Sequence, residues 1–147
     1  MKLEPQVFTL EEANSLVPQL RTLVGQQLAR RADIEDRLKS LAEATGEMPT
    51  EISPPEPNDA PAVRELKQEL LERIGRYQEA WSEVERLGAV VKDPRVGLVD
   101  FYGHVEGNAV WLCWKYGEDE IAHYHALDEG FGGRKPIGMS IKQRLLN

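Results

Sequence analysis

The chain has a single cysteine, no long apolar run and no signal-like beginning. One cysteine excludes an internal disulfide framework. No stretch approaches the roughly 20 apolar residues that a membrane helix needs. The opening MKLEPQVFTL also lacks the apolar core of a secretory signal. These absences predict a cytoplasmic protein with no membrane partner.

Basic residues are scarce as well: 18 Lys and Arg stand against 25 Asp and Glu, which gives a net charge of −7. Binding to phosphate backbones depends on clustered Lys and Arg, so we expect no nucleic-acid partner. The hydrophobic content of 41% is enough for one folded domain over residues 1–147.

Two segments have apolar residues at the spacing of an amphipathic helix. The first opens with Thr9-Leu10-Glu11-Glu12, the pattern of a capping box. Its apolar stripe runs to about Ala44, and Gly46 is a typical helix stop. A proline inside a helix removes a hydrogen bond. Pro18 therefore predicts a kink or a short leading helix, with the main helix beginning near this residue.

The second helical segment follows an acidic, proline-rich connector over 45–61. We expect Asn58 or Asp59 to cap its first turn and Gly88 to end it. Two helices of this length with matching stripes predict an antiparallel helical hairpin over 8–88. Each stripe is wider than a two-stranded seam needs, so part of it should cover the following strands or a second copy of the chain. The pattern predicts a homodimer and allows another protein partner.

After Gly88 the apolar residues alternate and glycine becomes frequent, as in short strands joined by turns. We expect four antiparallel strands, at 89–92, 98–102, 109–115 and 120–126. A glycine-rich loop at 130–133 and a short helix near 140–146 should follow. The predicted fold class is α+β: a long antiparallel helical hairpin, then a small antiparallel β-meander with its loop over 89–137, and a tail at 138–147.

Several motifs of this sequence are those of a known family. They are Phe8 to Asn14 with Pro18, Leu112-Cys113-Trp114, Gly117-Glu118, Ile121, His125, Gly130-Phe131 and Gly133-Arg134. In this order, from Phe8 to Ile137, the chain resembles a bacterial family known as domain of unknown function 2203. The resemblance implies a small bacterial cytosolic protein and brings no established activity.

The segment from Leu98 to Arg134 holds the cysteine and all three histidines. Within it, His123 and His125 are two residues apart, so on a strand both imidazoles face the same side. Two histidines and one acid, with an open position for water, would make a hydrolase-like site for zinc or another divalent metal. We take Glu120 as the third metal ligand. Other candidates are Glu118, His104, Glu129 and Cys113. The structural alternative is that one histidine binds a neighbouring backbone or carboxylate group and the other is exposed.

Cys113 lies between two tryptophans on the most apolar strand. Alternation places it on one face with Trp111 and Lys115. A thiol in such a strand is more often a small buried hydrophobe than a nucleophile.

The glycine-rich loop is followed by Arg134, whose guanidinium could bind an anion together with the loop amides. A turn that only redirects the chain is the alternative. We take His123, His125, Glu118 and Arg134 as the candidate ligand-binding residues. The main functional hypothesis is a homodimeric binding or assembly module. The alternative is a small metal-dependent, hydrolase-like enzyme with a site around His123 and His125.

Overall fold

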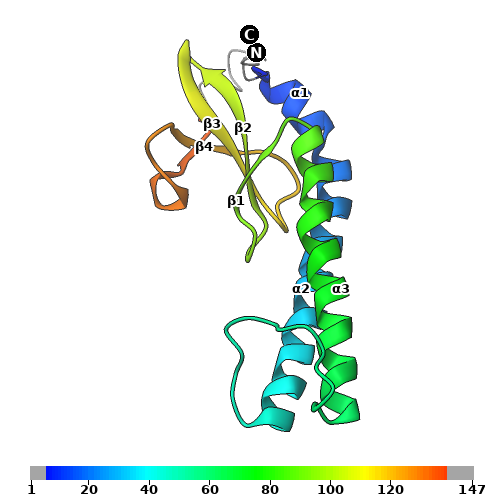
Figure 1. The fold of residues 1–147 in the computed structure, drawn as a ribbon. Helices are drawn as coiled ribbons and strands as arrows, with labels where there is room; N and C mark the ends of the chain where they lie inside the picture. The colour runs from blue at the N-terminus through cyan, green and yellow to red at the C-terminus, as the bar shows by residue number, and fades with distance from the viewer. Residues whose placement is uncertain (1–5, 139–147) are drawn as a thin grey trace, which may run out of the picture.

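The computed structural model describes residues 6–138 and has an α+β fold, as the sequence predicts. Helices and an antiparallel meander follow one another along the chain (Figure 1). The helices are α1 (Leu10–Ser15), α2 (Val17–Thr45) and α3 (Pro61–Arg86). The strands are β1 (Val90–Asp93), β2 (Leu98–Val105), β3 (Asn108–Lys115), β4 (His123–Ala126) and β5 (Lys135–Pro136), with a single 3-10 turn, η1 (Phe131–Gly133), before β5. They form one sheet in the order β1-β2-β3-β4-β5.

The start of the helical region follows from local chemistry. Thr9 accepts a hydrogen bond from the Glu12 amide at 3.0 Å, and Glu12 accepts one from the Thr9 amide at 3.0 Å, so the capping box is confirmed. The short leading helix is confirmed too, because α1 ends before Pro18, which lies in the first turn of α2. At the other end of α2, Gly46 has φ +84°, a left-handed conformation that favours glycine.

The predicted cap of the second helix is wrong. α3 begins at Pro61 with Ala60 as its N-cap, and no side chain caps it. The Asp59 carboxylate instead accepts hydrogen bonds from the Glu56 amide at 2.8 Å and from Lys67 at 2.9 Å. The acid therefore closes the connector onto itself and ties it to α3 rather than capping the helix.

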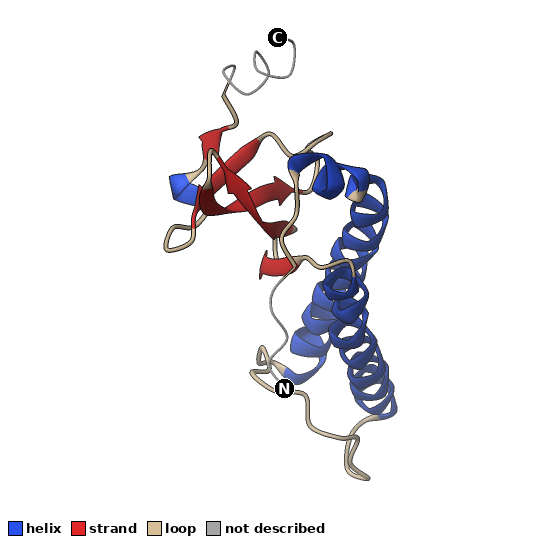
Figure 2. Ribbon diagram, turned by 90° about the horizontal axis from the view of Figure 1, so that it is seen from above, coloured by secondary structure: helices blue, strands red, loops and turns tan. Residues whose placement is uncertain are grey.

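α2 and α3 lie side by side over most of their length (Figures 1 and 2). Gln27, which is buried, donates to the backbone oxygen of Tyr77 at 2.7 Å. Farther along α2, Arg37 binds Glu69. As the residue number of the contact increases along α2, that of its partner on α3 decreases, so the two helices run in opposite directions.

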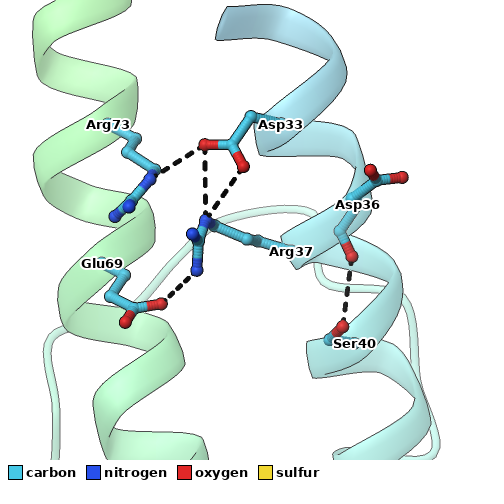
Figure 3. Close-up of polar contacts among 6 residues, drawn as sticks. All are labelled: Asp33, Asp36, Arg37, Ser40, Glu69 and Arg73. Carbon is cyan, nitrogen blue, oxygen red and sulfur yellow. Dashed lines mark hydrogen bonds and ion pairs between the residues drawn. The ribbon is translucent and has the colours of Figure 1, made fainter.

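A charged network crosses between these helices (Figure 3). Asp33 binds Arg37 of its own helix at 3.3 Å and Arg73 of α3 at 2.9 Å. Arg37 in turn binds Glu69. Exposed ion pairs contribute little individually, typically less than about 1 kcal/mol. Their role here is to fix which residues of α2 and α3 face each other.

The main core lies between the helices and one face of the sheet, which we call the inner face. Alternate residues of β2 and β3 point into it. Its buried members include Val99, Phe101, Val110, Leu112 and Trp114 from the sheet and Ala13, Val17, Leu20, Val24 and Val84 from the helices. A second, smaller core lies between α2 and α3 beyond the sheet, where Ile52 of the connector packs against it.

The last part of the sheet differs from the prediction in two ways. β4 begins at His123 rather than at 120, because the amide of Ile121 donates to Asn14 of α1 at 2.7 Å and its side chain is buried in the main core. The two-residue strand β5, which was not predicted, pairs with β4 through His123 and Tyr124. The helix predicted near 140–146 lies outside the described residues.

Candidate functional site

The face of the sheet away from the helices, which we call the outer face, carries the polar residues. The register pairs Asp100 with Cys113, Cys113 with His123, and Trp111 with His125. Paired residues point to the same side of an antiparallel sheet. β2, β3 and β4 therefore each place chemically active side chains on this one face.

Three of these side chains form what we call the acid–thiol–imidazole cluster. Asp100 and Cys113 are fully buried and His125 is 1% exposed. One carboxylate oxygen, the thiol sulfur and one imidazole nitrogen all lie within 4.8 Å of one another. Burial of an acid and an imidazole costs solvation free energy, and the interaction between the two groups must offset this cost.

Hydrogen-bond partners fix the protonation of the pair. His125 Nδ1 lies 3.0 Å from the backbone oxygen of Ala126, which only accepts, so Nδ1 carries a proton. His125 Nε2 lies 2.7 Å from Asp100 Oδ2. A second proton must lie between these two atoms, since a carboxylate and a bare imidazole nitrogen would both be acceptors. The pair therefore holds one shared proton.

Burial dominates the electrostatics of the cluster. It raises the pKa of Asp100, and the neighbouring His125 opposes this increase. Burial, followed by the adjacent Asp100 carboxylate, raises the pKa of the Cys113 thiol. The free thiol is thus protonated at neutral pH and is not a ready nucleophile.

A second polar group adjoins the cluster on the outer face. Arg134 donates from Nη2 to both oxygens of Glu118, at 2.7 and 2.8 Å. Glu118 also accepts from the Lys115 amide at 2.7 Å. His123 Nδ1 lies 3.6 Å from the other Glu118 oxygen. The Arg134 guanidinium lies 4.9 Å from the ring centre of Phe131, on the segment that turns back after β4 (orange in Figure 1).

This region also contains the buried side-chain nitrogen and oxygen atoms that lack a hydrogen-bond partner among residues 6–138. These atoms are Asp100 Oδ1, His123 Nδ1 and Arg134 Nε. Buried polar atoms of folded proteins nearly always have a hydrogen-bond partner. Three exceptions on neighbouring residues of one face indicate a place where a polar ligand or ion completes the bonding.

The sequence-derived candidates fall partly within this site. His123 and His125 lie on the same face of β4, and Glu118 contacts Arg134. Glu120 is exposed and does not belong to the acid–thiol–imidazole cluster. The acid beside His125 is Asp100, which sequence reasoning missed.

A signal for Asp100 was present in the sequence. It stands between Val99 and Phe101 in a strand that alternation already predicted. An acid at the centre of an apolar strand needs a buried partner. The partner could not be named without the pairing of β2 with β3 and β4.

Comparison with known proteins places the chain in a family. A family model described as Uncharacterized conserved protein (DUF2203) matches residues 6–137. The chain belongs to this family. No curated protein and no solved structure matches it. Within the described part of the DUF2203 chain, no helix is both long enough and apolar enough to cross a membrane.

Proposed function

We propose that this DUF2203 protein binds a divalent metal ion, with zinc as the first choice, through Asp100, Cys113 and His125. One observation carries the proposal: an acid, a thiol and an imidazole from three strands converge within 4.8 Å in a buried site. These are the three ligand types that zinc uses in proteins. A buried thiol alone would not indicate a metal site. A second observation points to a ligand here, because the buried Asp100 Oδ1 has no hydrogen-bond partner.

The orientation of His125 supports the same assignment. Metal-binding histidines usually donate their second ring N–H to a backbone carbonyl or carboxylate. His125 Nδ1 makes this bond to Ala126 at 3.0 Å, which directs Nε2 toward Asp100 and Cys113. The shared proton occupies the position that an ion would take between carboxylate and imidazole.

The cluster needs only a small expansion to hold the ion. Tetrahedral zinc bonds of about 2.0–2.3 Å separate neighbouring ligand atoms by roughly 3.4–3.6 Å. Asp100 Oδ2 and His125 Nε2 lie 2.7 Å apart. The lower end of this range applies to an oxygen–nitrogen pair, so the two atoms would move apart by roughly 0.7 Å. A carboxylate and a thiolate together neutralise the two charges of the ion.

The ligand set replaces the one expected from sequence, since Glu120 is exposed while Asp100 and Cys113 lie next to His125. A zinc ion with three protein ligands and a water lowers the pKa of that water to about 7. Such an ion would supply the hydrolase-like chemistry of the alternative hypothesis. A reduced thiol as ligand also favours a reducing compartment such as the cytoplasm.

Elemental analysis of the untagged full-length protein tests the proposal. The protein is exposed to zinc, passed through a desalting column and analysed. We expect about one zinc per chain in the wild type and in the control His104→Ala, whose imidazole is exposed on β2. We expect loss of the metal in His125→Ala and Cys113→Ser. A wild-type protein that retains no metal would refute the proposal.

A homodimer is the second candidate, and the helix pair favours it. Beyond the sheet, two shallow hollows on α2 and α3 share Leu38 and Ile74 in their walls. Leu71, which lines one of them, is 40% exposed. Leu38, Leu71 and Ile74 form a strip of partly exposed apolar side chains on the two helices, which suits a four-helix contact between two copies.

Light scattering after size exclusion tests the dimer. Leu71→Lys introduces a charge into the strip and should convert the dimer to a monomer. Leu127→Lys is the matched control, because Leu127 is 48% exposed after β4. A wild-type protein that is monomeric at micromolar concentration would contradict the homodimer and leave the metal proposal untouched.

A further inference from the structure

Arg134 is the feature of the outer face that a metal site alone does not explain. Its side chain is 11% exposed, and its Nη2 is committed to Glu118. Its Nε is buried and has no hydrogen-bond partner. Because a guanidinium nitrogen only donates, this atom lacks an acceptor.

Neighbouring groups fix the direction of this donor. Glu118 cannot turn away freely, since it also accepts from the Lys115 amide at 2.7 Å. Trp114 Nε1 donates to the Glu118 backbone oxygen at 2.9 Å. Phe131 lies against the guanidinium at 4.9 Å. Arg134 is therefore held in place from two sides before any ligand arrives, which lowers the entropic cost of binding.

His123 offers a second ring nitrogen near the proposed ion, 3.6 Å from a Glu118 oxygen and so beyond hydrogen-bond distance. Its Nδ1 is buried and lacks a hydrogen-bond partner. His123 pairs with Cys113 across the sheet, and paired side chains have Cβ atoms about 4.5–5.5 Å apart. His123 thus borders the thiol side of the acid–thiol–imidazole cluster, and Glu118 links it to Arg134.

The charges favour an anion once the metal is bound. The ion, the Asp100 carboxylate and the Cys113 thiolate sum to zero, and Arg134 and Glu118 neutralise each other. Lys115 lies near the same ring, with its Nζ 5.4 Å from the Phe131 ring centre. An anionic group placed here would meet the Arg134 Nε–H, a charge-assisted donor with no partner.

We infer that the metal-loaded protein binds the carboxylate of a small organic acid, with Arg134 Nε–H donating to one oxygen and His123 Nδ1–H donating to the other. This inference rests on the proposed metal site. A carboxylate suits the site because one planar group presents two oxygens to two separate nitrogen atoms. Arg134 and His123 would position the ligand and set specificity for a negative charge.

Cobalt substitution and acetate titration test the inference on the full-length chain. Cobalt bound by a thiolate, a carboxylate and an imidazole absorbs visible light, and the spectrum changes when an anion joins the ion's surroundings. We expect a saturable acetate-dependent change in the wild type. The apparent affinity should fall at least tenfold in Arg134→Ala and remain unchanged in Arg95→Ala, whose arginine is exposed and pairs with Asp93.

The possible results separate the two proposals. No cobalt spectrum would overturn both the metal site and the carboxylate site. A cobalt spectrum that acetate does not alter, or one that responds equally in Arg134→Ala, would overturn the carboxylate site alone. If Arg134→Lys binds acetate as tightly as the wild type, Nε–H is not required, because lysine keeps the positive charge but has no Nε–H donor. A response to inorganic phosphate without one to acetate would refute the assignment to a carboxylate.

Discussion

Replacing Asp100 in two different ways separates its structural role from its proposed role as a metal ligand. In the metal-free protein, Asp100 and His125 share one proton across 2.7 Å. The amide of Asp100→Asn has the same shape and its N–H can donate to His125 Nε2. The hydrogen bond then survives without a buried ionisable acid. We expect the free energy of unfolding to change by less than about 1 kcal/mol.

Asp100→Ala should behave differently. It leaves His125 Nε2 buried without a partner, which costs about 1–3 kcal/mol. It also removes the packing of a fully buried side chain. The total loss should be about 2–4 kcal/mol, or a decrease in Tm of roughly 5–15 °C for a chain of this size.

Urea denaturation followed by circular dichroism, first with a chelator and then with zinc, measures both roles. In the wild type, zinc at 100 times its dissociation constant should add about 2.7 kcal/mol to the free energy of unfolding. In Asp100→Asn this gain should disappear, because an amide is a poor ligand for zinc. Equal losses of stability in Asp100→Asn and Asp100→Ala with chelator would refute the shared proton. A normal zinc effect in Asp100→Asn would refute Asp100 as a ligand.

Two further predictions concern the thiol and the first helix. Cys113 is fully buried and the pKa of its thiol is raised by burial. It should react with a disulfide reagent only after unfolding, and rapid modification of the native protein would contradict this picture. The pKa of Glu12 is lowered by its hydrogen bond from the Thr9 amide. Its capping contribution is therefore present above the ordinary pKa of 4.5 and disappears as the pH falls through the lowered value. Glu12→Ala removes the acceptor of the Thr9 amide and should therefore lower the free energy of unfolding at neutral pH, measured by urea denaturation. A cost that did not decrease at acid pH would argue against the reciprocal bond.

The elements that depend on neighbouring residues could be predicted from the sequence. Thr9 and Glu12 are three residues apart, and both halves of their capping box form as expected. Pro18 separates α1 from α2, and Gly46 ends α2 with a positive φ. In each case the cause lies within one helical turn of its effect, so a single sequence carries the information.

The errors arise where several partners compete for one side chain or one backbone group. Asn58 or Asp59 was expected to cap α3, but neither does, and Asp59 binds Lys67 and the Glu56 amide. β4 is shorter than expected because Ile121 donates to Asn14, which is 107 residues away. A local pattern identifies residues that are able to form such bonds. It does not identify which of several competing partners the fold brings within reach.

The candidate site depends on distant partners more than any helix does. His125 was visible as one half of a same-face pair, but what it can do is determined by Asp100, 25 residues earlier on a different strand. A shift of one residue in the pairing of β2 with β3 would move Asp100 out of register with Cys113. The imidazole of His125 would then have no carboxylate partner, and Cys113 would be a buried thiol that only fills space in the fold. The register that packs Val99 and Phe101 against the helices also brings Asp100 to the outer face. Formation of the main core and assembly of the proposed metal site are therefore the same structural event.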